Sequence, residues 1–231
     1  MSDQPTAASP DGEGKHGNDN DVRKAAHDAV REMRQRLTKL GDDGLDLLFR
    51  SARSHHGWQD RPVSDEEIRE LYEVVKWGPT SVNGNPARFI FVRSAEAKKK
   101  LSECVKPGNV HKVLAAPVTA IIAYDMEFWT ELDQLHAHED MTHMFRDKPA
   151  NAEKSAFRNS TLQGAYFMIA ARAMGFDVGP KSGFDNAKVD AAFFDGTSLK
   201  SNFLCSFGYA DETAIFQRLP RLDFDRACEI L

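Results

Sequence analysis

Apolar residues recur at helical spacing in several parts of the chain. Ser64 and Glu67 form a capping-box pattern ahead of an apolar stripe that ends before a Gly-Pro pair. Residues 162–174 are apolar on nearly every side, which predicts a central, fully buried helix, and Gly175 supplies a stop of the Schellman type. A further helix, capped by an aspartate, is expected over 185–194.

Three other segments have the composition of strands. Residues 88–94 and 201–210 are rich in strand-forming side chains, and 118–125 is apolar on both faces, which is typical of a strand inside a sheet. A short surface helix is expected over 95–105, and the polar residues 126–155 suggest a mobile cover. This succession predicts one α+β (mixed α/β) domain, with helices around a mixed central sheet.

The N-terminal part of the chain differs in composition from the rest. Residues 1–20 contain almost nothing that can be buried, which predicts a disordered tail. Residues 21–43 are predicted to form a helical extension, whose thin apolar stripe suits either a peripheral helix or a frayed one. The compact domain is expected to span 44–231.

Composition and charge exclude several classes of function. The chain has 231 residues, of which 41% are hydrophobic and 28% charged, and a net charge of −5, so no broad basic field favours nucleic acid or an anionic membrane. No apolar run is long enough to span a membrane. The three cysteines are widely spaced, which favours reduced thiols in the cytoplasm. His136, His138 and His143 lack a zinc-binding pattern, so no metal is expected.

Four loop segments concentrate groups that could carry chemistry. They are RSARSHHGWQDRPVS (50–64), GPTSVNGNPAR (78–88), GPKSGFD (179–185) and RLPRLDFDRA (218–227). Taken singly, each has a plain structural interpretation as a turn or as solvated surface arginines. Taken together, they supply guanidinium groups, short hydrogen-bonding side chains and backbone amides between buried elements.

These segments, in this order, resemble the flavin-dependent nitroreductase family. The resemblance rests on an arginine-led segment and helix followed by P-T-S-x-N-x-x-P, on AMGFDVGPKSGFD, and on the closing RLPRLDF, and it covers residues 45–231. The further motifs HxGWxxxPVSDE, AFRNS and FFxGxxLKSN are similar to the malonic semialdehyde reductases of bacterial pyrimidine utilisation, a subgroup of that family. The resemblance implies a nitroreductase-like fold and a homodimer with FMN at its interface.

The same resemblance implies which residues contact FMN. Arg53, Arg218 and Arg221 would hold the phosphate as bidentate donors, and Ser54 and His55 would bind phosphate, ribityl chain or ring edge. The residues expected to cradle the ring are Ser81, Asn83, Pro180, Lys181, Ser182 and Gly183. Many nitroreductases have an acidic residue in place of Ser182 and a bulkier or basic one in place of Gly57.

The implied reaction passes hydride from NADPH or NADH to the flavin and then to a second substrate, with ping-pong kinetics. For malonic semialdehyde, which would become 3-hydroxypropionate, a cation must bind the carboxylate, and the candidates are Arg88, Lys181 and Lys200. His55 is the candidate to polarise the carbonyl. A broad nitro or quinone reductase, and a flavin-binding protein without reductase activity, remain the alternative interpretations.

Overall fold

The computed structural model describes residues 14–37 and 39–231, which fall into two compact units divided between Leu45 and Asp46. The first unit contains helices α1 (Gly14–Arg36) and α2 (Asp42–Leu45). Helix α1 begins earlier than predicted, so residues 14–20 are helical and do not belong to a disordered tail. The rest of the predicted tail, residues 1–13, lies outside the described residues.

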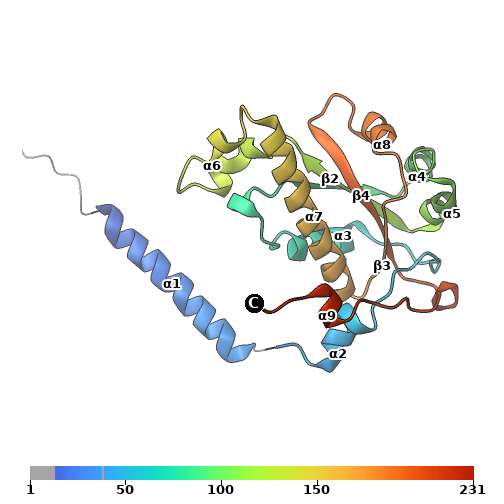
Figure 1. Cartoon of the computed structure of the whole chain (residues 1–231), viewed down its shortest axis with the longest axis horizontal. Helices are drawn as coiled ribbons and strands as arrows, with labels where there is room; N and C mark the ends of the chain where they lie inside the picture. Colours follow the sequence, from blue (N-terminus) through green and yellow to red (C-terminus); the bar gives the residue numbers. More distant parts are fainter. Residues whose placement is uncertain (1–13, 38) are drawn as a thin grey trace, which may run out of the picture. The chain divides into compact units, whose positions relative to one another are not determined.

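The second unit is built around one four-stranded sheet with the strand order β1-β2-β4-β3 (Figure 1). All three pairings are antiparallel. The predicted α+β fold class is confirmed, but the prediction of a mixed sheet was wrong, because these four strands pair in antiparallel fashion only. The strands are β1 (Ala87–Val92), β2 (Val118–Asp125), β3 (Asp177–Lys181) and β4 (Leu199–Gly208).

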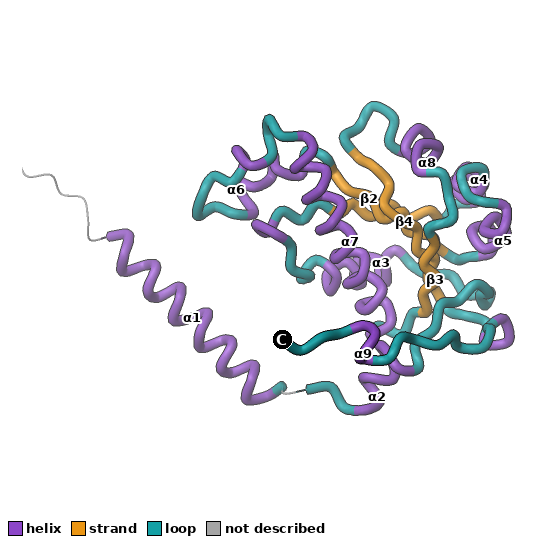
Figure 2. Tube along the Cα trace, in the orientation of Figure 1, coloured by secondary structure: helices purple, strands orange, loops and turns teal. Residues whose placement is uncertain are grey.

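Helices cover both faces of the sheet, and Figure 2 shows the long helix α7 crossing it. Helix α7 contacts all four strands and α3, whereas α4 and α8 contact strands β1 and β4, and α5 packs on α4. The helices of this unit are α3 (Asp65–Val75), α4 (Ala95–Ser102), α5 (Pro107–Ala115), α6 (Leu132–Leu135), α7 (Pro149–Ala173), α8 (Asn186–Phe193) and α9 (Phe224–Ala227), with short π or 3₁₀ turns at Asp46–Arg50, Ser81–Asn83, Phe128–Glu131, Thr142–Met144 and Glu212–Ala214. Within the described residues, no helix is both long and apolar enough to cross a bilayer.

The two faces of the sheet bury separate parts of the core because strand side chains alternate. Ile122 and Phe207 pack with Phe167 of α7, whereas Ile121 and Leu204 belong to the cluster on the opposite face, beneath α4, α5 and α8. A strand apolar on both faces was predicted for 118–125, and β2 is buried along nearly its whole length. A third cluster, centred on Phe128 and Phe145, is formed mostly by residues of the segment 126–155 itself, so the segment predicted as a mobile cover contains a small apolar core.

Helix α7 differs from the prediction of a fully buried helix. It begins at Pro149, inside the segment expected to be a cover, and it leaves three large apolar side chains in solvent on a single chain. Phe157, Leu162 and Tyr166 are between 41% and 49% exposed. A hydrophobic stripe of this kind on a central helix is suited to burial against another surface.

Local signals at helix ends were confirmed. Ser64 and Glu67 form the predicted capping box, the side chain of Asp185 caps α8, and Gly175 takes the left-handed conformation after α7. Strand β3 and helix α5 were not predicted. Strand β3 contains a glycine and a proline, which are uncommon inside strands, and α5 begins with a Lys-Pro-Gly sequence that looks like a turn.

We predict that Glu67→Gln lowers the free energy of unfolding by about 1 kcal/mol at pH 7. The carboxylate of Glu67 accepts a hydrogen bond from the Tyr209 hydroxyl at 2.6 Å, and this bond holds the pKa of Glu67 below its usual value. Because the pKa is lower in the folded chain, the stabilisation is present above the unfolded pKa and is lost as the pH falls through the folded value.

Urea denaturation at pH 7 and at acidic pH measures this effect. The difference between the two proteins should shrink as the pH falls, and a difference independent of pH would contradict a role for the carboxylate charge. Glu70→Gln, on the exposed face of the same helix, is the control and should leave stability unchanged.

Candidate functional site

Four arginines line a single cavity of about 630 Å³ on the second unit. Arg53 follows the first π-helical turn, Arg172 lies near the C-terminal end of α7, and Arg218 and Arg221 belong to the C-terminal segment. Among the described residues, no aspartate or glutamate lines this cavity; its other lining residues are Phe49, Ala52, Ser54, His56, Ala214, Phe216, Gln217 and Leu219. We call it the arginine cavity.

Backbone carbonyls fix the guanidinium groups of the arginine cavity. Arg53 donates to the carbonyl of Phe216, and Arg218 donates to the carbonyl of Ala52 at 2.7 Å. These two hydrogen bonds join the arginine-led segment at the start of this unit to its C-terminal segment. Arg221 bonds only to carbonyls of its own turn, at 3.0 Å. The hydrogen-bond acceptors of these three arginines are thus neutral carbonyls and not carboxylates.

Arg172 is a member of this group that the sequence analysis missed. It donates to the carbonyls of Leu48 at 3.1 Å and Arg53 at 3.5 Å, and its burial lowers its pKa from the usual high value of arginine. The sequence contained a signal for it, because a cation in the mostly apolar stretch 162–174 must have a specific reason to be there. It was overlooked because periodicity assigned that helix to the core alone.

The two histidines of the first segment point in different directions. His55 places Nε2 at 3.2 Å from the Asp177 carboxylate, and it is not among the residues that line the arginine cavity. His56 lines the cavity, and its Nδ1 is buried without a hydrogen-bond partner. Burial lowers the pKa of both rings, and Lys112 and Lys181 lower that of His56 further, so both are neutral at pH 7.

The first segment is held against strand β3 by the backbone. The amide of His55 donates to the carbonyl of Val178 at 2.9 Å, and Ser54 forms a bridge with the same residue. Gly179 makes this approach possible, because a β-carbon there would lie 2.1 Å from the carbonyl oxygen of His55.

Immediately after β3, the chain presents two backbone amides. The N–H groups of Ser182 and Gly183 have no acceptor within the part of the chain that the structure describes. The Gly183 carbonyl is tied down by the amide of Lys106 at 2.9 Å and by the side chain of Asn109 at 3.0 Å. Asn109 and Lys112, both on the unpredicted helix α5, thus join the neighbourhood of the predicted ring-binding segment.

The side chain of Lys181 turns away from solvent. It is 6% exposed and donates to the Gly179 carbonyl at 2.8 Å and to the Ser206 hydroxyl at 2.6 Å. Burial lowers the pKa of Lys181 to about 8. This position restricts any direct contact between its amine and a bound molecule.

The loop GPTSVNGNP lies at a different cavity, of about 560 Å³, which shares no lining residue with the arginine cavity. Asn83 and Asn85 line it, and both take the left-handed conformation, as does Val82 between Ser81 and Asn83. The amide of Ser81 donates to Asn159 at 2.8 Å. The predicted phosphate-binding arginines and the predicted ring-binding residues Ser81 and Asn83 therefore lie at separate cavities on one chain.

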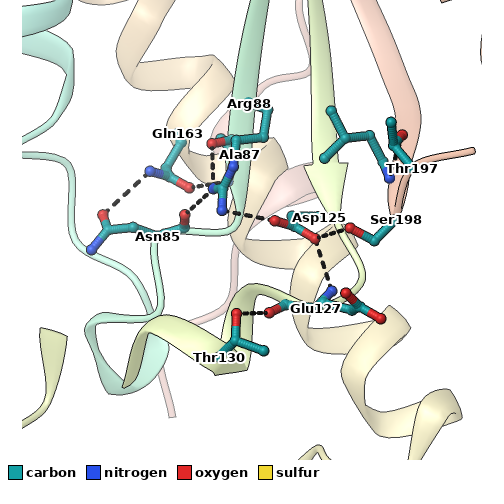
Figure 3. Close-up of polar contacts among 10 residues, drawn as sticks. Asn85, Ala87, Arg88, Asp125, Glu127, Thr130, Gln163, Thr197 and Ser198 are labelled. Carbon is teal, nitrogen blue, oxygen red and sulfur yellow. Dashed lines mark hydrogen bonds and ion pairs between the residues drawn. The ribbon is translucent and has the colours of Figure 1, made fainter. Parts of the chain in front are cut away.

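Two predicted carboxylate-binding cations already have acidic partners. Figure 3 shows Arg88 in an ion pair with Asp125 at 2.8 Å, and Asp125 also accepts a hydrogen bond from Ser198. Arg88 further donates to the Asn85 carbonyl at 3.0 Å. Lys200 pairs with Glu153 at 2.9 Å.

No group of three side chains suited to a metal ion occurs among the described residues.

Comparison with known proteins gives one consistent result. The family model described as "Nitroreductase family" matches residues 49–209. Among solved structures, the chain is similar to a nitroreductase from Exiguobacterium sibiricum in complex with FMN, with 21% identity and a TM-score of 0.73 over 84% of this chain and 100% of that one. It is also similar to an NAD(P)H:FMN oxidoreductase from Staphylococcus epidermidis, with 22% identity and a TM-score of 0.73 over 84% and 98% of the two chains. A gut-bacterial enone reductase matches at 20% identity and a TM-score of 0.72, over 84% and 100%.

We predict that Gly179→Ala destabilises the fold by about 2 kcal/mol or more, because the new methyl group collides with a backbone carbonyl. Denaturant unfolding measures the loss, and hydrogen exchange should show that the His55 amide loses protection. Gly108→Ala is the control, because nothing lies within 4 Å of a β-carbon there. Equal stability of the two variants would contradict the close packing of the first segment on β3.

Proposed function

The chain belongs to the nitroreductase family, and we propose that it is an FMN-dependent NAD(P)H oxidoreductase that reduces malonic semialdehyde to 3-hydroxypropionate in pyrimidine catabolism, in the cytoplasm. The observation that carries the cofactor assignment is the arginine cavity, where four guanidinium groups converge with no carboxylate among the described lining residues. Two similar structures, named for an FMN complex and for NAD(P)H:FMN oxidoreductase, support the same assignment. All three cysteines are free thiols, which suits the cytoplasm.

The residues of the arginine cavity fit the phosphate end of FMN. A phosphate monoester carries up to two negative charges, and planar guanidinium groups bind it in bidentate fashion. Arg53 and Arg218 are already oriented by carbonyl bonds, and Arg172 is fixed from α7. The unpartnered Nδ1 of His56 is an acceptor suited to a hydroxyl group of the ribityl chain.

The segment after β3 fits the flavin ring. The free N–H groups of Ser182 and Gly183 are donors for the ring's acceptor atoms, and Lys112 adds a cation that acts on the preceding residue, Lys181. Pro180 limits the freedom of this backbone. When bound, FMN supplies the hydride chemistry, accepting hydride from NAD(P)H and passing it on. The chain binds and orients the reactants.

We propose that the active form is a homodimer in which the GPTSVNGNP loop of one chain completes the arginine cavity of the other. This arrangement accounts for the separation of Ser81 and Asn83 from the arginines on one chain. It also accounts for the apolar side chains that α7 and the C-terminal segment leave in solvent, including Leu162, Tyr166 and Phe216. Their burial would provide a hydrophobic driving force for association.

The substrate assignment depends on a cation for the carboxylate of the semialdehyde. Arg88 and Lys200 would each have to leave an acidic partner, and Lys181 is buried. Because all three candidate cations are already paired or buried, a second candidate function is favoured. It is the reduction of an uncharged nitro compound or quinone. His55, the proposed carbonyl-polarising group, is directed to Asp177 and would act only if the substrate reached it.

We predict that Arg221→Ala weakens FMN binding by about 2 kcal/mol or more, roughly 30-fold in Kd, through loss of a charge-assisted hydrogen bond. Arg172→Met should weaken it at least tenfold. Quenching of flavin fluorescence on titration of the apoprotein gives Kd. Arg34→Ala, on α1 of the first unit, is the control and should bind normally. Normal binding by both cavity variants would exclude the phosphate from this cavity.

We predict that the FMN-loaded protein oxidises NADPH or NADH faster with malonic semialdehyde than with a nitroaromatic at equal concentration. Side-by-side measurement of kcat/KM decides between the two candidate functions. Reduction of the nitroaromatic without turnover of the semialdehyde would establish the second candidate. Failure of NAD(P)H to bleach the bound flavin without oxygen would identify a flavin-binding protein that is not a reductase.

We predict that the protein has the mass of two chains in light scattering, and that Leu162→Glu makes it monomeric and weakens FMN binding. Leu162 is 47% exposed on one chain, and a buried charge at an interface without a partner is strongly unfavourable. Leu114→Glu on α5, at 46% exposure, is the matched control and should remain dimeric. A monomer that binds FMN normally would contradict the shared site.

A further inference from the structure

Lys181 is a buried cation whose neighbours do not neutralise it. Its two hydrogen-bond acceptors, the Gly179 carbonyl and the Ser206 hydroxyl, are both uncharged, and Ser206 in turn pairs with Thr119 at 2.8 Å. An ammonium group has three donors, and the third N–H of Lys181 has no acceptor among the described residues. No carboxylate there forms an ion pair with Lys181.

The titratable groups that act on Lys181 come from two neighbouring elements. Cys205 of β4 is fully buried, and burial raises its pKa to about 12, so its thiol is neutral at pH 7 and provides no counterion. Lys112 of α5 is a second cation and lowers the pKa of Lys181. The amine of Lys181 is nevertheless still mainly protonated at pH 7, because its pKa of about 8 lies above that pH.

A buried charge of this kind opposes folding. Moving an ammonium group out of water is unfavourable unless an anion or several strong acceptors replace the water. A hydrophobic side chain of the same length would fill the position without this disadvantage. A feature that opposes stability in this way indicates a functional role.

The position of the charge indicates what that role is. Lys181 ends β3 and directly precedes the free N–H groups of Ser182 and Gly183. Lys112 lies close enough to lower the pKa of both Lys181 and His56. Backbone N–H dipoles and two cations therefore produce a positive potential at the place where, under the proposed function, the flavin ring lies.

We propose that the buried ammonium group of Lys181 raises the reduction potential of bound FMN by stabilising the negative charge that the ring gains on reduction. This inference rests on the proposed function. Hydride carries two electrons and one proton, so its transfer from NAD(P)H leaves NAD(P)⁺ and adds one negative charge to the ring. A fixed cation nearby, in surroundings of low dielectric constant, favours the reduced form over the oxidised one.

The test is an anaerobic redox titration of the full-length FMN-loaded protein, followed by flavin absorbance. Lys181→Met removes the charge and keeps the length of the side chain, and Lys99→Met, an exposed lysine of α4, is the matched control. At pH 7 and a fixed applied potential, Lys181→Met should lower the ratio of reduced to oxidised cofactor at least tenfold. For a two-electron couple, this corresponds to a reduction potential lower by about 30 mV. Lys99→Met should match the wild type.

The pH dependence has a definite direction. The difference between wild type and Lys181→Met should be largest below pH 8 and should shrink above it, as Lys181 loses its proton. If Lys181→Met does not fold, the wild type alone decides. Its reduction potential must fall more steeply with pH around pH 8 than uptake of a proton by the flavin alone requires, because Lys181 also loses its proton there. A wild-type reduction potential that shows no such steeper fall around pH 8 overturns the inference.

The outcomes separate this inference from the proposed function. A wild-type protein that takes up no FMN overturns both. A protein that binds FMN, with equal potentials in the wild type and Lys181→Met, overturns the role of Lys181 and leaves the FMN assignment intact.

Discussion

The candidate site depends on the close contact between strand β3 and the arginine-led segment. At Gly179 the backbone of that segment comes so near that no side chain fits, and the amide of His55 bonds to the carbonyl of Val178. This contact joins the segment carrying Arg53 to the sheet. The C-terminal segment then closes over it through the carbonyl bonds of Arg53 and Arg218. Three distant parts of the chain thus depend on one backbone contact.

The second property of the site is that its cations donate hydrogen bonds to uncharged acceptors and not to carboxylates. Several cations elsewhere in the described residues have acidic partners, as in the pairs Arg88–Asp125 and Lys200–Glu153. In the arginine cavity and at Lys181, the acceptors are carbonyl and hydroxyl groups. A protein with a net charge of −5 has carboxylates to spare. Their exclusion from these positions is the physical basis for assigning the region to an anionic cofactor.

Sequence reasoning succeeded where structure is determined locally. The capping box of α3, the aspartate cap of α8 and the left-handed Gly175 were all predicted, because each involves residues within one or two turns of each other. Sequence reasoning did not reveal strand β3, because its Gly179 is required for a contact with the distant segment that contains His55. It also missed Arg172 and could not foresee that Arg88 pairs with Asp125, because both depend on partners far along the chain.

The central claim is that the arginine cavity binds the phosphate of FMN, and comparison of FMN with riboflavin tests it most directly. Riboflavin has the same ring and ribityl chain but no phosphate. Titration of the wild-type apoprotein with each compound should give a Kd for riboflavin at least about 30-fold higher, which corresponds to about 2 kcal/mol of charge-assisted hydrogen bonding. Equal affinity for the two compounds would contradict the account.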